Sequence, residues 1–142
     1  MPKEAIRTES APKPLGDYSQ SWTVSGAKLI FLAGQVSVDM NGNLIGSGDI
    51  ALQTRTVMEN LKKVLEGAGA SLRDVIKLNT YVTNIDEYNE KTRDIRLQYF
   101  PQDFPSRTTV EVKSLYSPEA MVEIEAIAAV RTGSLPFKKS KS

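Results

Sequence analysis

Two residue types are missing from this chain of 142 residues, which contains neither cysteine nor histidine. Without cysteine, the chain can form no disulfide and offers no thiolate nucleophile. Without histidine, it lacks the side chain that most often acts as a general base near neutral pH, ligates zinc or completes a catalytic triad. Any catalysis must therefore use carboxylates, hydroxyl groups, Lys, Arg, backbone amides and water.

The chain also has little net charge and no dense acidic cluster. Lys and Arg number 18 against 17 for Asp and Glu, so no overall positive field is available to attract nucleic acid or an anionic membrane. Basic residues are not interleaved with aromatic ones, and a nucleic-acid partner is therefore not favoured. Acidic residues do not occur at the loop spacing of an all-oxygen Mg²⁺ or Ca²⁺ site, so we expect no bound metal.

No stretch is long and apolar enough to cross a bilayer, and the N-terminus has no apolar core typical of a secretion signal. We therefore expect a cytoplasmic protein with no membrane partner. With 40% apolar residues, the chain is predicted to form one domain over residues 17–132. Residues 1–16, which include three prolines, are expected to form an extended arm with little structure of its own, and residues 133–142 a basic, flexible tail.

The hydrophobic pattern predicts strands and helices in the order β β α β α β β. Segments of alternating or continuous apolar residues predict the strands, and apolar residues three and four positions apart predict the helices. The predicted strands are 18–24, 28–38, 75–83, 107–115 and 121–130, and the predicted helices are 49–67 and 86–100. Two helices can cover only one face of such a sheet. Because two of the strands are apolar on both sides, we expect another copy of the chain to cover the other face.

Arg107 is the first candidate for a functional role. It lies in FPSRTTVEV, residues 104–112, two positions after a proline and at the beginning of a predicted strand. The proline and the β-branched residues that follow are expected to stiffen the backbone. A planar guanidinium on a stiff backbone suits bidentate recognition of a carboxylate. The alternative is a strand-end arginine that pairs with a neighbouring acid or lies in solvent.

Glu123 and Glu125 are the second candidates. Both lie in MVEIEAIAAV, residues 121–130, and they share one face of that strand because side chains alternate. A carboxylate among apolar neighbours needs a partner or holds a proton more readily, and either property suits a proton acceptor or a water-orienting group. The alternative is a pair of salt bridges between strands, for example to Lys77 or Lys113.

Other positions are weaker candidates on their own. Tyr18 offers a hydroxyl group beside a ring, and Gly34, which follows Ala33, lets another group approach the backbone closely. Trp22 is most simply a core or interface aromatic residue. Taken alone, each of these residues is more often used for packing or for a turn.

Five stretches of the sequence, taken together, resemble successive blocks of the YjgF/RidA family, the reactive-intermediate imine deaminases. They are GDYSQ, FLAGQVSVD, QTRTVMENLKKVLEGAGASLRDVIKLNTYV, FPSRTTVEV and MVEIEAIA, and the similarity extends from about Tyr18 to Val130. The resemblance implies a chorismate-mutase-like α+β fold with two helices on one face of a mixed sheet. It also implies a homotrimer with clefts between the subunits.

The resemblance also implies roles for single residues and a reaction. Arg107 corresponds to the arginine that grips the substrate carboxylate, and Glu123 to the glutamate that positions water. Tyr18 and the backbone at Gly34 and Thr109 complete the pocket. The implied reaction is hydrolysis of a 2-imino acid, such as 2-iminobutanoate or 2-iminopropanoate, to a 2-oxo acid and ammonia. The implied partner is therefore a small carboxylate-bearing substrate, and no metal or organic cofactor is required.

This chain differs from the best-known deaminases of the family at several positions. Thr109 replaces a cysteine, Ala33 replaces a serine, and a helix asparagine has no clear counterpart, since Thr92 or Arg93 falls near that position. If Arg93 faces the cleft, a second cation favours a dicarboxylic enamine of the aminomuconate type. A member without catalysis, which binds small carboxylates or regulates a partner protein, is the alternative function.

Overall fold

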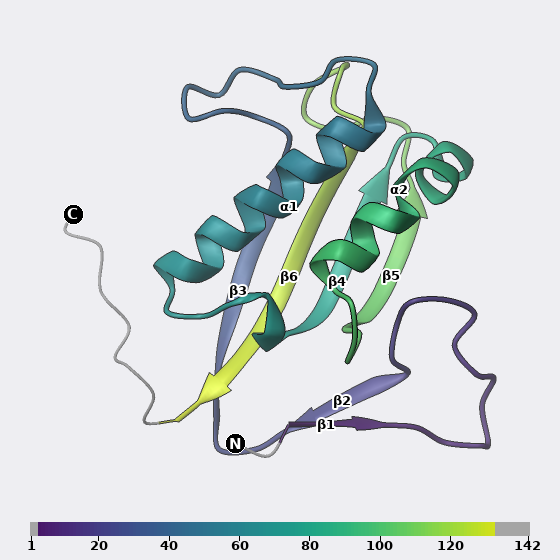
Figure 1. The fold of residues 1–142 in the computed structure, drawn as a ribbon, viewed down its shortest axis with the longest axis vertical. Coiled ribbons are helices and arrows are strands. Elements are labelled where there is room, and N and C mark those ends of the chain that lie inside the picture. The colour runs from purple at the N-terminus through teal and green to yellow at the C-terminus, as the bar shows by residue number, and fades with distance from the viewer. Residues whose placement is uncertain (1–2, 133–142) are drawn as a thin grey trace.

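Four strands form a mixed sheet, and two helices pack on one of its faces (Figure 1). The structure, a computed structural model, describes residues 3–132. The strand order is β3-β6-β4-β5, in which β6 is antiparallel to both of its neighbours while β4 and β5 are parallel. These strands are β3 (Ala27–Val36), β4 (Val75–Val82), β5 (Ser106–Glu111) and β6 (Val122–Arg131).

The helices begin at capping residues that the sequence places at their N-termini. Helix α1 (Ile50–Gly67) begins after Asp49, whose side chain accepts a hydrogen bond from the backbone N–H of the third helical residue. Helix α2 (Ile85–Tyr99) begins after Asn84, which caps its first turn in the same way. A short 3₁₀ helix, η1 (Leu72–Asp74), precedes β4. The predicted α+β fold with both helices on one face is confirmed.

The N-terminal segment is more ordered than the sequence analysis expected. Strand β1 (Lys3–Ile6) pairs antiparallel with β2 (Ser21–Val24) in a separate two-stranded sheet. The first residues described are thus extended, as expected, but they form a paired strand and not an arm without structure. The predicted tail over residues 133–142 lies outside the described residues. No helix in the described part of the chain has the length and hydropathy of a membrane-spanning segment.

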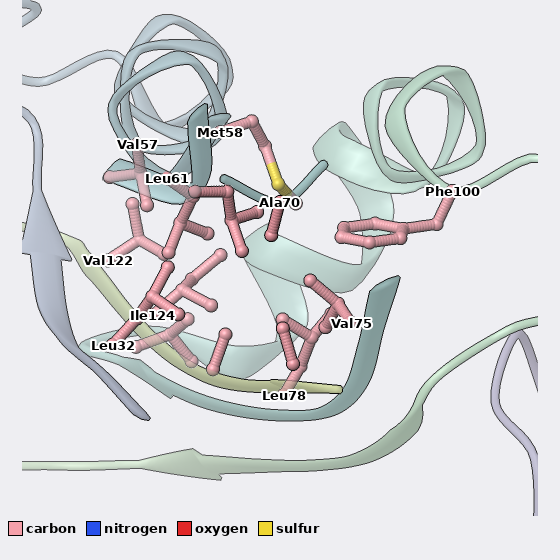
Figure 2. Packing of buried hydrophobic residues seen from close by; sticks show 14 of the residues in the cluster. Leu32, Val57, Met58, Leu61, Ala70, Val75, Leu78, Phe100, Val122 and Ile124 are labelled. Atoms are coloured by element: carbon pink, nitrogen blue, oxygen red, sulfur yellow. The ribbon is translucent and has the colours of Figure 1, made fainter. Parts of the chain in front are cut away.

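The main core lies between the helices and the sheet (Figure 2). It is built from the apolar stripe of α1 and the inward positions of the strands, among them Val57, Leu61, Leu78, Val122 and Ile124. Among residues 3–132, no element covers the opposite face of the sheet in this way: Leu29 is 46% exposed and Phe31 is 71% exposed. The prediction that two helices leave one apolar face uncovered is therefore confirmed.

One buried polar side chain connects the beginning of α1 to the beginning of β6. The amide nitrogen of Gln53, fully buried on α1, donates hydrogen bonds to the carbonyl oxygens of Gly46 at 3.0 Å and Glu119 at 2.9 Å. Its side-chain oxygen accepts a hydrogen bond from the backbone N–H of Met121 at 2.8 Å. Because Met121 directly precedes β6, Gln53 helps to fix the strand that carries Glu123.

We expect the substitution Gln53→Leu to lower the free energy of unfolding by about 3 kcal/mol, because each buried polar group left without a partner costs about 1–3 kcal/mol. Urea denaturation followed by circular dichroism measures this. Gln102→Leu, at an exposed position, is the matched control and should change stability by less than about 0.5 kcal/mol. Equal stabilities of the two variants would contradict the role given to Gln53.

Candidate functional site

Arg107 lies at the start of β5 and points toward the helices. Its register partner on β4 is Leu78, a core residue, so the two side chains share the helix-covered face of the sheet. The Arg107 side chain is only 15% exposed. Its two terminal nitrogens donate to the two carboxylate oxygens of Asp17, at 3.3 and 3.1 Å. Its guanidinium carbon also lies 5.9 Å from the centre of the Tyr18 ring. In one chain, Arg107 thus pairs with an acid, as the alternative interpretation held. Its two terminal nitrogens bind the two oxygens of that carboxylate in a bidentate arrangement.

The same carboxylate binds a second arginine. Arg96 on α2 donates from Nη1 to Oδ1 of Asp17 at 2.7 Å, and both side chains are mostly buried, at 7% and 17% exposure. The Nε of Arg96 donates to Oγ1 of Thr92 at 3.3 Å, and its guanidinium carbon lies 5.4 Å from the centre of the Tyr88 ring. Burial raises the pKa of Tyr88, while the positive charges of Arg96 and Arg107 act in the opposite direction. We call Asp17, Arg96 and Arg107 the charge cluster.

The arginine of α2 that belongs to the charge cluster is not the one that the sequence analysis considered. Arg93 is exposed and does not reach the charge cluster, whereas Arg96, three residues later, is 6% exposed and belongs to it. Helical periodicity could have found Arg96, since it lies four positions after Thr92 and eight after Tyr88, both of which are buried. Asp17 gave no comparable signal, because its partners are remote in the sequence.

Backbone contacts fasten the loop between β1 and β2 against the start of β5 (Figure 1). The N–H of Ser19 donates to the carbonyl oxygen of Pro105 at 3.2 Å, and the hydroxyl of Ser106 donates to the carbonyl oxygen of Ser19 at 3.1 Å. The Tyr18 hydroxyl accepts a hydrogen bond from the N–H of Leu15 at 3.0 Å. These contacts hold Asp17 and Tyr18 beside Arg107.

Thr109 lies on the same face of β5 as Arg107, opposite Thr80 of β4. Its hydroxyl oxygen is buried and has no hydrogen-bond partner among residues 3–132. A buried hydroxyl group without a partner is uncommon in proteins. A ligand held by Arg107 could therefore also interact with Thr109.

Glu123 lies on the opposite face of the sheet from Arg107. Its register partner on β4 is Tyr81, three residues from Leu78, the partner of Arg107. Side chains alternate along a strand, so residues three apart point to opposite faces. One copy of the chain therefore cannot bring the side chains of Arg107 and Glu123 into one site.

Gly34 provides the space that the Glu123 carboxylate occupies. A Cβ atom at Gly34 would lie 2.1 Å from Oε1 of Glu123, far closer than two atoms can approach. The pairing of β3 with β6 is irregular between Leu32 and Gln35, which places Ala33, which is exposed, and Gly34, which is half-buried, within a bulge. The structure thus brings together Gly34 and Glu123, two of the residues that the sequence analysis singled out.

Glu125 is held by neighbours on the same open face. It accepts hydrogen bonds from the Asn79 side-chain amide at 3.1 Å and from the Tyr81 hydroxyl at 2.8 Å, and the latter bond raises the pKa of Tyr81. Lys77, one of the suggested salt-bridge partners, instead donates to Thr108 at 3.2 Å. Glu123 and Glu125 line an open cavity of about 450 Å³. Residues 3–132 contain no group of three or more acidic side chains placed to hold a metal ion.

The fold is that of the small α+β proteins in which two helices cover one face of a mixed sheet. The chain matches the family described as Endoribonuclease L-PSP over residues 8–130 and belongs to this family, which includes the YjgF and Rid proteins. The Rid family protein YyfB from Yersinia pestis has a similar structure, with a TM-score of 0.82 and 32% sequence identity. That alignment covers 92% of this chain and 100% of YyfB.

Curated relatives cover nearly the whole chain. A RutC family protein of Pyrococcus horikoshii is 44% identical over 126 residues, which are 89% of this chain and 97% of that protein. A 2-iminobutanoate/2-iminopropanoate deaminase of Dermatophagoides farinae is 34% identical, over 91% of this chain and 98% of the relative. A 3-aminoacrylate deaminase, RutC, of Acinetobacter baylyi is also 34% identical, over 92% of this chain and 100% of the relative.

We expect Gly34→Ala to displace the Glu123 carboxylate without unfolding the protein, because the close atoms all belong to the flexible Glu123 side chain. A crystal structure of the variant should show the carboxylate moved, with stability changed by less than about 1 kcal/mol. Gly67→Ala, where an added Cβ meets open space, is the control and should leave Glu123 in place. An unmoved Glu123 carboxylate in Gly34→Ala would refute the close approach.

Proposed function

We propose that the protein hydrolyses 2-imino acids to 2-oxo acids and ammonia, in a site that Arg107 of one copy and Glu123 of another copy form together. The observation that carries this proposal is the fork of Arg107, which already holds a carboxylate, that of Asp17, by both terminal nitrogens. A guanidinium held in that geometry suits the carboxylate of a small organic acid. The relatives named as imino-acid and aminoacrylate deaminases support the same reaction.

The shared site follows from the two faces of the sheet. Glu123 lies on the face that leaves Leu29, Phe31 and Val110 exposed in one chain. Another copy that covers this apolar face can bring its own Arg107 to Glu123, which no rearrangement of a single sheet can do. A closed ring of three copies, as the resemblance implies, has three equivalent clefts of this kind.

The chemistry needs no group that the chain lacks. The imine carbon of the substrate is electrophilic, so the site must hold the carboxylate, align one water molecule and transfer protons. The substrate reacts as its protonated imine, C2=NH₂⁺. Arg107 binds the carboxylate, and Glu123 accepts a proton from water as the water oxygen bonds to C2, which gives a tetrahedral intermediate with OH and NH₂ on C2. The proton on Glu123 then passes to the nitrogen. As the C–N bond breaks, the hydroxyl proton returns to Glu123, so ammonia leaves and C2 becomes the carbonyl carbon of the 2-oxo acid.

We expect Arg107→Ala to weaken binding of 2-oxobutanoate, a product analogue, by about 2–5 kcal/mol, the usual cost of removing one member of a buried charge pair. Isothermal titration calorimetry measures the dissociation constant. Arg131→Ala, at the exposed end of β6, removes another strand-end arginine and should leave the constant unchanged. The same dissociation constant for the Arg107 variant and the wild type would overturn the role of Arg107.

We expect Glu123→Gln to retain 2-oxobutanoate binding but to slow ammonia release about 100-fold or more, because it removes the proton acceptor. An amino-acid oxidase supplies the imine in a coupled assay, and Glu90→Gln, on the exposed face of α2, is the control. Assembly of mixed oligomers from the Arg107→Ala and Glu123→Gln chains should restore about a quarter of the wild-type activity, since that fraction of shared clefts contains both intact residues.

The outcomes of these assays separate the possible functions. If mixed oligomers stay inactive, the two residues do not share a cleft. If the wild-type protein binds 2-oxobutanoate but does not accelerate deamination of any imine, it is a carboxylate-binding member without catalysis, and the enzymatic proposal is wrong.

A further inference from the structure

The charge cluster contains one negative group that the resemblance did not imply. Asp17 lies on the loop between β1 and β2, whereas Arg96 and Arg107 lie on α2 and β5. Its Oδ1 atom accepts from both arginines, at 2.7 Å from Arg96 and 3.1 Å from Arg107, and its Oδ2 accepts from Arg107 at 3.3 Å. A single carboxylate therefore partly neutralises two buried guanidinium groups.

The charge that remains fits one ligand carboxylate. Within one copy, the two guanidinium groups and the one carboxylate of the charge cluster carry a net charge of about +1, since both arginines stay protonated in proteins. One carboxylate of a ligand completes the neutralisation of this cluster. The Glu123 carboxylate of the other copy adds a further negative charge to the cleft, which disfavours a second ligand carboxylate still more. A second carboxylate on the same ligand would bring an excess negative charge into a largely buried space, and like charges there are strongly unfavourable.

The two arginines also differ in their access to a ligand. Arg96 is 6% exposed and is enclosed by Asp17, Thr92 and the ring of Tyr88. Arg107 is 15% exposed in its side chain, and Asp17 takes one N–H from each of its two terminal nitrogens. A guanidinium has five N–H groups, so Arg107 keeps donors for a ligand while Asp17 is in place.

We propose that Asp17 determines how many carboxylates the substrate carries. Its ion pair with Arg96 prevents that arginine from binding the substrate, so Arg107 alone binds a carboxylate, that of an imino acid with a single carboxylate. This inference rests on the proposed function, in which Arg107 binds the substrate carboxylate. It replaces the expectation, based on Arg93, of a dicarboxylic substrate. The second cation of this site exists, but Arg96 provides it and Asp17 neutralises it.

The substitution Asp17→Asn tests the proposal, because the amide keeps the size of the side chain and can still accept a hydrogen bond from Arg96. Calorimetry measures the dissociation constants of two four-carbon ligands, 2-oxobutanoate and oxaloacetate. Oxaloacetate has a second carboxylate where 2-oxobutanoate has a methyl group. The wild-type protein should prefer 2-oxobutanoate. In Asp17→Asn, the affinity for oxaloacetate relative to 2-oxobutanoate should rise at least about tenfold.

Two further variants act as controls. Asp94→Asn makes the same change of charge at an exposed position of α2 and should leave the ligand preference unchanged. The double variant Asp17→Asn/Arg96→Gln removes the released cation and should abolish the gain for oxaloacetate. A gain that persists in the double variant, or an equal change for both ligands in Asp17→Asn, would show that Asp17 only fastens its loop and would overturn the proposal.

If Asp17→Asn does not fold, the single variant Arg96→Gln decides. Without Arg96, Asp17 would pair with Arg107 alone and neutralise its charge. The dissociation constant of 2-oxobutanoate should then rise at least about fivefold. Unchanged affinity overturns the inference. Failure of the proposed function looks different, because 2-oxobutanoate would then fail to bind the wild-type protein or would bind independently of Arg107.

Discussion

The ion pairs of Asp17 with Arg96 and Arg107 are the interactions on which the site depends. They join a loop near the N-terminus, the last turn of α2 and the start of β5. Because all three side chains are mostly buried, removing any one of them leaves a buried charge without its partner, which is strongly destabilising. The loop is consequently held against β5, and Tyr18 is kept beside the Arg107 guanidinium.

The alternation of side chains along a strand imposes the second constraint. It sends Arg107 to the helix-covered face and Glu123 to the open face, where Gly34 makes room for the carboxylate. The same alternation leaves Phe31 exposed on that open face. Within residues 3–132, the apolar face that stays exposed is therefore also the face that carries Glu123, so the proposed association between copies would both cover that face and bring an arginine to Glu123.

Local sequence signals predicted the elements well and the long-range contacts poorly. Apolar periodicity located both helices, and the period of two placed Glu123 and Glu125 on one face. The pairing of β1 was missed because a short polar strand has no pattern of its own. Asp17 was missed for a related reason: its role comes from partners about 80 and 90 residues away, and no period relates such positions.

The absence of histidine is compatible with the proposed reaction. Imidazole changes its charge near neutral pH, whereas guanidinium and carboxylate groups ordinarily do not. Because the imine is itself electrophilic, the reaction needs no group poised to titrate in order to activate the substrate. The proposed reaction therefore requires no residue type that this chain lacks.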